Sequence, residues 1–322
     1  MSPLLDPGAP RSLLADAEVV LTRDEAQQVV DRVVRLNTVD GVQVAIRSSR
    51  ERNLRFAANQ LSTAGVTENA SVVITSSVGK RRASVTTNDL SPDGLARAVR
   101  KAEAIARLAP EDPETMPLLG AQRYVEIPGA WDGATAALDA AAASEAARSA
   151  LEPARAGSTL EVAGFFIVSG SATAIGNSAG LFAYHRATRA NYTITARTAD
   201  GTGSGWASAD GTAWGTLDIA GASRRAIDKA LRSRRPVAIE PGRYTVILEP
   251  TAVGDLVGLL PRYFQARSAD EGRSPFSKRG GGTRVGEAIV SPLVTLASDP
   301  ADATVLAAPF DGDGLPLRRQ TW

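Results

Sequence analysis

Apolar residues recur with two different periods in the first part of the chain. Over 23–36, valines and a leucine recur at three- and four-residue spacing and form one stripe, which predicts an amphipathic helix. Thr22 and Glu25 at its start have the spacing of a capping box, in which each side chain accepts a hydrogen bond from the other residue's backbone amide. After Asp40, apolar and polar residues alternate over 42–46, which predicts a half-buried strand.

Further strand-like segments and a second helix complete this first region. Strands are predicted at 53–58, 71–77 and 80–87. Pro92 begins the next segment with helical periodicity, and a proline is favourable at a first helical position because the missing N–H has no partner there. The order helix, strands, helix predicts a layer in which helices cover one face of a largely antiparallel sheet.

The remaining chain repeats this order once and then becomes irregular. Residues 108–128 contain four prolines, which predicts a linker. After it we expect an alanine-rich helix at 134–151, strands at 160–169, 172–175, 180–189 and 191–198, a loop at 201–215 and a helix at 219–233. Beyond the boundary at 236–241 we expect strands at 244–248 and 290–296, a short helix or turn at 251–260 and a glycine-rich loop at 267–286.

These boundaries predict an α+β protein organised in five segments. They are a flexible arm at 1–21, an N-terminal α/β domain at 22–107, the linker at 108–128, a middle domain at 129–235 and a partial β-rich C-terminal domain at 236–322. The first two domains are expected to be antiparallel sheets with helices. The chain ends shortly after a turn-rich segment at 311–314, so we expect the third domain to be incomplete, as in a truncated chain.

Charge and composition exclude several classes of protein. The 36 Lys and Arg residues nearly balance the 35 Asp and Glu residues, so the chain lacks the cationic excess that phosphate binding needs. There is no cysteine, which excludes disulfides, thiolate nucleophiles and sulfur-based zinc sites. No apolar run reaches the roughly 20 residues of a membrane helix. We therefore expect a soluble cytoplasmic protein without nucleic-acid or membrane partners.

One short motif has the pattern of a hydrolase nucleophile. Residues 176–180 read G-x-S-x-G, which would make Ser178 the nucleophile of an α/β-hydrolase elbow. That elbow needs a following helix and a distant histidine, whereas strand character follows here and the only histidine is His185. We expect a tight hairpin turn in which Asn177 and Gly180 tolerate positive φ. His185 alone forms no metal pair, so it is expected to be a packed or surface residue.

Carboxylates and glycine-rich segments give no further motif. Two converging carboxylates can serve acid–base chemistry or bind a hard cation, and the candidates are Glu249, Asp255, Asp270, Glu271, Asp299, Asp302, Asp311 and Asp313. Asp311 and Asp313 have the spacing of an EF-hand start, but the later ligands are absent, so a turn is expected. The glycine-rich segments 200–205 and 278–282 do not lie between a strand and a helix, as a phosphate-binding loop would.

Several short segments, taken in order, resemble the TldD/PmbA (TldD/TldE) family of metallopeptidases, which act on unstructured peptides. They are 55–60 (RFAANQ), 84–91 (SVTTNDLS), 106–114 (ARLAPEDPE), 177–180 (NSAG) and 309–316 (PFDGDGLP). Each is weak alone, but their order and spacing cover most of the chain. The resemblance implies an N-terminal α/β domain, a middle domain and a β-rich C-terminal domain.

In the catalytic branch of that family, the third region opens with His-Glu-x-x-x-His on a helix, where two imidazoles bind zinc and the glutamate acts as general base. The matching segment here is 246–255. In this register Pro250 and Asp255 replace the histidines, and Thr251 replaces the glutamate. The resemblance therefore implies no catalytic residue, metal or cofactor in this chain. Glu249 and Asp255 are the candidate residues for lining a peptide chamber.

The TldE/PmbA branch of the family lacks the zinc motif and pairs with a zinc-bearing TldD-like subunit. The resemblance thus implies a non-catalytic subunit of a heterodimer that degrades or processes unstructured peptides, with an extended peptide held by addition to an exposed strand edge. Two alternatives stay open. One is an enzyme in its own right that modifies a small peptide or natural product through carboxylates such as Glu249 and Asp255. The other is a stand-alone binding or scaffold module.

Overall fold

The computed structural model describes residues 20–139, 141–142, 144–145, 148, 160–302, 304 and 307–322. The chain divides into two compact units. Unit 1 comprises Met1–Pro236 with Ala297–Gln320, and unit 2 comprises Val237–Leu296 with Thr321–Trp322. In the part of the chain that is described, no helix combines the length and the hydropathy needed to cross a membrane.

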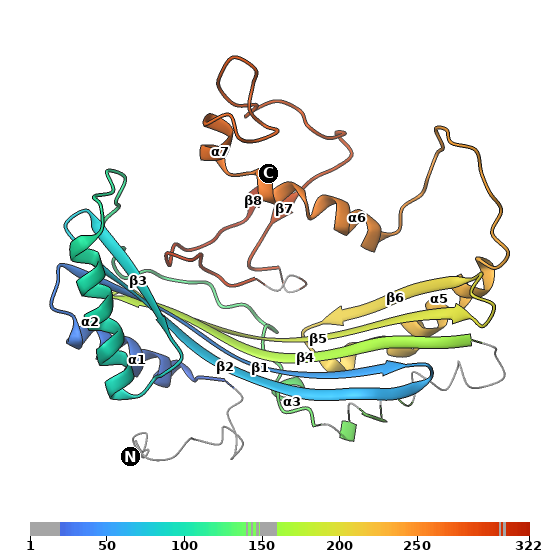
Figure 1. Cartoon of the computed structure of the whole chain (residues 1–322), viewed down its shortest axis with the longest axis horizontal. Helices are drawn as coiled ribbons and strands as arrows, with labels where there is room; N and C mark the ends of the chain where they lie inside the picture. Colours follow the sequence, from blue (N-terminus) through green and yellow to red (C-terminus); the bar gives the residue numbers. More distant parts are fainter. Residues whose placement is uncertain are drawn as a thin grey trace. The chain divides into compact units, whose positions relative to one another are not determined.

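Unit 1 is built on a six-stranded antiparallel sheet with the order β3-β2-β1-β4-β5-β6 (Figure 1). The strands are β1 (Gly41–Ala57), β2 (Gln60–Val78), β3 (Arg81–Thr87), β4 (Leu160–Asn177), β5 (Phe182–Thr198) and β6 (Ser204–Gly211). Because β1 pairs with β4, strands from the first and middle regions form one continuous sheet. The predicted α+β class with an antiparallel sheet is confirmed. The predicted domain limits themselves stay predictions.

Three helices cover one face of this sheet: α1 (Arg23–Leu36), α2 (Pro92–Leu108) and α5 (Ile219–Arg232). The helices α1 and α5 agree with the predicted ones to within one residue, and α2 begins at the predicted Pro92. The capping box of Thr22 and Glu25 is confirmed. Helices α1 and α2 pack on alternate residues of β1 such as Val44, whereas α5 packs through small alanines on Leu54 and its neighbours. Alternation along β1 therefore places its apolar side chains against the helices and leaves the opposite face polar.

An aromatic cluster forms the core below α5. The ring of Phe166 stacks on Tyr192 with centroids 4.6 Å apart and lies 5.4 Å from Trp214, which belongs to η1 (Trp214–Thr216). Phe56 lies 5.9 Å from Phe166. The Tyr192 hydroxyl is fully buried and shares a hydrogen bond of 2.8 Å with the Ser223 hydroxyl of α5. This bond satisfies the one polar group that a buried tyrosine brings into a core.

Several sequence predictions for the middle region are wrong in detail. The four short strands predicted between 160 and 198 are two long ones, β4 and β5. The loop predicted at 201–215 contains β6, an edge strand whose small residues lie against α5. A continuous helix over 134–151 is also wrong, because α3 (Gly133–Ala136) ends at Ala136 and is followed by a turn. Much of the remaining predicted helix lies outside the described residues.

Unit 2 contains the helices α6 (Pro250–Val257), η2 (Leu260–Tyr263) and α7 (Ala266–Asp270). The short helix expected at 251–260 is confirmed by α6. The strands predicted at 244–248 and 290–296 are wrong for the described structure, because both segments are irregular. Each has strand-like residues without a pairing neighbour, and Ile247 and Leu293 are 98% and 96% exposed. The two-stranded sheet of β7 (Ala297–Ser298) and β8 (Gln320–Thr321) contains Ala297, Ser298 and Gln320 of unit 1.

Candidate functional site

Helix α6 carries the three residues that the family resemblance assigns to the zinc motif. Pro250 is its first residue, where a proline stabilises the helix start, and Glu249 is the N-cap residue without a side-chain capping bond. Thr251 follows, and Asp255 lies in the second turn. None of the helix residues is buried, so the side chains of Thr251 and Asp255 face solvent within unit 2.

The donor atoms at these positions do not fit a zinc site. The ring of Pro250 has no lone pair to offer a metal, and Asp255 is the only carboxylate within α6. Zinc sites in enzymes use three protein ligands drawn from imidazole, thiolate and carboxylate groups. Among the residues that the structure describes, no three His, Cys, Asp or Glu side chains lie together in a metal-binding group. The assignment of Glu249 and Asp255 to the lining of a peptide chamber stays a prediction.

Ser178 belongs to the turn that joins β4 to β5. Its backbone N–H donates to the carbonyl of Val42 at 3.0 Å, and its hydroxyl accepts from the Val42 N–H at 3.1 Å. The Asn177 amide oxygen accepts from the N–H groups of Ala179 and Leu181 at 2.9 and 3.2 Å. The predicted hairpin turn is confirmed, with positive φ at Gly180 (92°), but the expected positive φ at Asn177 is wrong. Ser178 therefore stabilises a turn, and a strand follows it.

The C-terminal segment 309–316 lies against this same turn. Phe310 packs with Leu181 in a small buried cluster, and its ring lies 5.3 Å from that of Tyr124. The Tyr124 hydroxyl donates to the carbonyl of Gly314 at 2.7 Å. Burial and the Asp311 carboxylate raise the pKa of Tyr124, so the phenol stays protonated and able to donate. Two of the family-like segments, 177–180 and 309–316, are thus brought together in space.

Two further sequence candidates are Asp311 and His185. The Asp311 carboxylate accepts from the N–H groups of Asp313 and Leu315 at 2.9 Å, which confirms the predicted turn at this position. His185 lies on the polar face of the sheet opposite Thr173 on β4. Burial lowers the pKa of His185, so its imidazole is neutral near pH 7. Neither residue belongs to a group of converging catalytic side chains.

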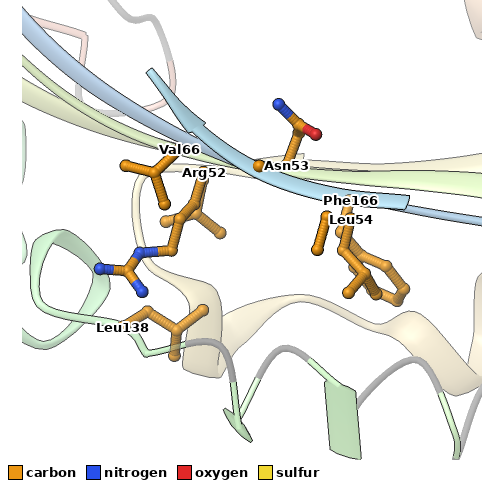
Figure 2. Close-up of a pocket in the computed structure, with 9 residues that line it drawn as sticks. Arg52, Asn53, Leu54, Val66, Leu138 and Phe166 are labelled. Carbon is orange, nitrogen blue, oxygen red and sulfur yellow. The ribbon is translucent and has the colours of Figure 1, made fainter. Parts of the chain in front are cut away.

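A cavity of about 200 Å³ lies beside β1, β2 and β4. The sequence did not predict it. It is lined by Arg52, Asn53, Leu54, Ala64, Gly65, Val66, Leu138, Phe166 and Val168. Figure 2 shows Arg52, Leu54, Val66 and Phe166 on one side of the strands and Asn53 pointing to the other. These residues come from three strands and a loop, so only strand register brings them together. The one local signal is the pair of small residues, Ala64 and Gly65, within a strand.

The fold and the site define an α+β protein with one sheet shared between its first two regions and a third region that follows them. Three consecutive family models match it. They are PmbA/TldA metallopeptidase domain 1 at residues 42–106, the central domain at 131–234 and the C-terminal domain at 241–322. The chain belongs to the PmbA/TldD metallopeptidase family.

Three solved structures share the fold. A candidate modulator of a DNA gyrase, TM0727 from Thermotoga maritima, superimposes with a TM-score of 0.80 at 21% identity, over 93% of this chain and 68% of that one. TldE from Thermococcus kodakarensis gives a TM-score of 0.75 at 21% identity, over 92% and 66% of the two chains. A candidate modulator of DNA gyrase from Bacteroides thetaiotaomicron (BT3649) gives a TM-score of 0.78 at 17% identity, over 93% of this chain and 70% of that one. No curated protein sequence matches the chain.

Proposed function

We propose that this chain is the non-catalytic, TldE-like subunit of a TldD/TldE-type metallopeptidase that processes unstructured peptides. The proposal rests on the start of α6, where the family resemblance aligns Pro250, Thr251 and Asp255 with the positions of the zinc motif. A proline provides no metal ligand, and a threonine hydroxyl is not a base near neutral pH. Zinc and the general base would then come from a TldD-like partner subunit in the cytoplasm.

Family membership and the likeness to TldE from Thermococcus kodakarensis support this proposal. Within the heterodimer this chain would help to enclose the peptide, and Glu249 and Asp255 would line the chamber. An unstructured peptide has no fixed shape to recognise, so its backbone is the feature that every substrate shares. Backbone pairing at a strand edge meets that requirement, because it does not depend on side chains.

The proposal is tested by measuring cleavage of an unstructured fluorogenic peptide with and without a TldD-like zinc subunit. We expect the chain alone to cleave nothing and the pair to cleave in a chelator-sensitive way. Ser178→Ala should leave the activity of the pair unchanged, which separates this mechanism from serine hydrolysis. Strong chelator-sensitive cleavage by the chain alone, with metal bound in stoichiometric amount, would overturn the proposal and favour an enzyme in its own right.

A further inference from the structure

Strand β2 extends well beyond the strand that pairs with its outer side. β3 pairs only with Val72–Val78 of β2. Beyond that pairing, the side-chain amide of Asn88 donates to the side-chain oxygen of Asn69 at 2.8 Å. Residues 63–68 pair in regular register with β1 on their inner side. Within the described parts of the chain, no strand lies on their outer side. We call residues 63–68 the free edge.

The free edge lacks most of the usual features that prevent strand edges from pairing. Natural edges are protected by lysines, prolines, inward-facing charges or bulges. The sequence of the free edge, Thr-Ala-Gly-Val-Thr-Glu, contains no lysine or proline. Its one charge, Glu68, faces inward but is neutralised by an ion pair with Arg50 at 3.0 Å. The register shift of the hairpin lies nearer its tip, at Arg55 and Phe56. The outward backbone groups of this edge can therefore pair with another extended chain.

The cavity described above opens beside this edge. Ala64, Gly65 and Val66 of the free edge line one side of it, and Leu54 and Phe166 line its interior. Val66 is 48% exposed, whereas Leu54 and Phe166 are 5% and 2% exposed, so the cavity runs from an open rim to a buried apolar floor. Its volume of about 200 Å³ is suited to one large apolar side chain.

A positive charge lies at the wall of the cavity. Arg52 precedes Leu54 by two residues on β1, so both side chains point to the same side of the sheet (Figure 2). Burial and the neighbouring Arg50 lower the pKa of Arg52, while Asp139 and Glu68 act in the opposite direction. An arginine stays charged in proteins near neutral pH, so this wall favours a carboxylate.

We propose that the free edge and the cavity together form a recognition site for an extended peptide. The peptide adds to β2 as a seventh strand, inserts one large apolar side chain into the cavity and places an acidic residue two positions away beside Arg52. The inference rests on the proposed function and assigns peptide binding to this subunit. Backbone pairing supplies affinity, and the pocket for an alternate side chain supplies selectivity.

A second copy of the chain is a poorer occupant than a peptide. Its own free edge would present only threonine, alanine, glycine, valine and glutamate side chains. None of these is large and apolar enough to fill a cavity whose floor is formed by Leu54 and Phe166. An unstructured peptide meets both requirements, because it brings free backbone groups and has no fixed limit on the side chain inserted.

The test uses the 322-residue chain without a zinc subunit and a fluorescein-labelled decapeptide of Thr and Ser with one central Phe and one Asp two residues away. Binding is measured by fluorescence anisotropy. Replacing the peptide Phe by Ala should weaken binding about ten-fold, as expected for the loss of a buried aromatic side chain. Two further peptides carry N-methyl groups on alternate backbone nitrogens, one on the odd-numbered and the other on the even-numbered residues. One of these two peptides should lose binding, because its methyl groups replace the N–H donors that face β2.

Two pairs of variants locate the site on the protein. Val66→Trp fills the rim and should weaken binding at least about ten-fold. Val125→Trp is its matched control, because Val125 is 50% exposed and lies in a different part of unit 1. Arg52→Glu should weaken binding of the Asp-containing peptide, whereas Arg47→Glu, on the opposite face of β1, should not. Far-UV circular dichroism checks that each variant is folded.

Hydrogen exchange gives an independent readout, because peptide binding should protect amides within residues 63–68. The inference is overturned if both methylated peptides bind as tightly as the parent, or if Val66→Trp and Val125→Trp behave alike. It is also overturned if these amides become protected by raising the protein concentration without peptide, since a second copy then occupies the edge. No partner subunit is present in these measurements. A negative binding result would therefore overturn the peptide site but not the proposal of partner-dependent cleavage. Conversely, lack of cleavage by the pair would not remove peptide binding here.

Discussion

Replacing Glu103 by alanine removes a carboxylate that links α2 to the end of α1. Glu103 is only 4% exposed. One of its oxygens accepts from the backbone N–H of Thr38 at 2.7 Å, and the other accepts from the Thr38 hydroxyl at 2.7 Å. Arg107 lies one turn further along α2, with its guanidinium 3.9 Å from the carboxylate. The two short bonds to Thr38 therefore provide most of what Glu103 contributes.

The size of the effect follows from these contacts. A hydrogen bond to a charged group contributes roughly 1.5–3 kcal/mol net, and a buried donor left without a partner is unfavourable by a similar amount. Arg107 is half-exposed, so its interaction is screened and adds little. We expect Glu103→Ala to lower the free energy of unfolding by about 3 kcal/mol. Glu103→Gln should lower it by only about 1 kcal/mol, because an amide can accept from the N–H and donate to the hydroxyl.

Urea denaturation followed by circular dichroism measures these changes. A double-mutant cycle with Thr38→Val isolates the hydroxyl bond and should give a coupling of about 1–2 kcal/mol. Glu111→Ala is the matched control, because Glu111 is 65% exposed and forms only a surface ion pair with Arg81 at 3.5 Å. The reasoning is refuted if Glu103→Ala stays within about 0.5 kcal/mol of the parent or if the cycle shows simple additivity.

Two further predictions concern the aromatic core. Burial raises the pKa of Tyr192 to about 12, so the stability that its protonated phenol provides is complete below about pH 10 and is lost as the pH rises from 10 to 12. Urea titrations between pH 10 and pH 12 should show that Tyr192→Phe loses less unfolding free energy than the parent chain. Equal losses in the two proteins would contradict this prediction. Gly164→Ala would place a methyl group 2.2 Å from both the Phe56 ring and the Thr193 carbonyl oxygen. We expect this variant to lose about 3 kcal/mol of folding free energy, measured by thermal unfolding. Gly215→Ala is the control and should lose almost none, because no neighbouring atom lies within 4 Å of its new methyl group. Similar melting temperatures of the two variants would refute the steric argument.

The helices were predictable because their signals are local. Thr22 and Ser91 both accept hydrogen bonds at the helix starts that their sequences indicate, and the apolar stripes of α1 and α2 face the sheet. Burial of Glu103 was not predictable from the same stripe, since its partner Thr38 lies 65 residues away. A capping residue and its helix are neighbours in sequence, whereas the partner of a buried carboxylate is fixed only by packing.

Strand lengths were harder to predict because small polar residues interrupt the alternation. Ser169, Gly170 and Ser171 suggested a break, yet β4 continues through them since they pair with residues of both β1 and β5. β6 was missed for a related reason. Its glycines, serines and alanines have low strand propensity, and its strand structure depends on β5 and α5. Pairing partners distant in sequence decided these elements.

The two candidate sites differ in the same way. The candidate positions on α6 were assigned from resemblance to a short motif, because Pro250, Thr251 and Asp255 lie within six residues. The cavity beside the free edge was not found, because Arg52, Val66 and Phe166 meet only through strand register. No periodicity in the sequence distinguishes these residues from others that alternate along the same strands.

The proposed peptide site and the motif positions on α6 belong to different units of the chain. The free edge and its cavity are built entirely from residues of unit 1, whose sheet is stabilised by its own helices and aromatic core. The motif positions on α6 lie in unit 2. Pro250 has no donor atom for a metal but is favourable at a helix start, so α6 can form without a bound metal. The residues of the proposed peptide site all belong to unit 1, so a substitution at the positions that the resemblance assigns to the zinc motif changes none of them.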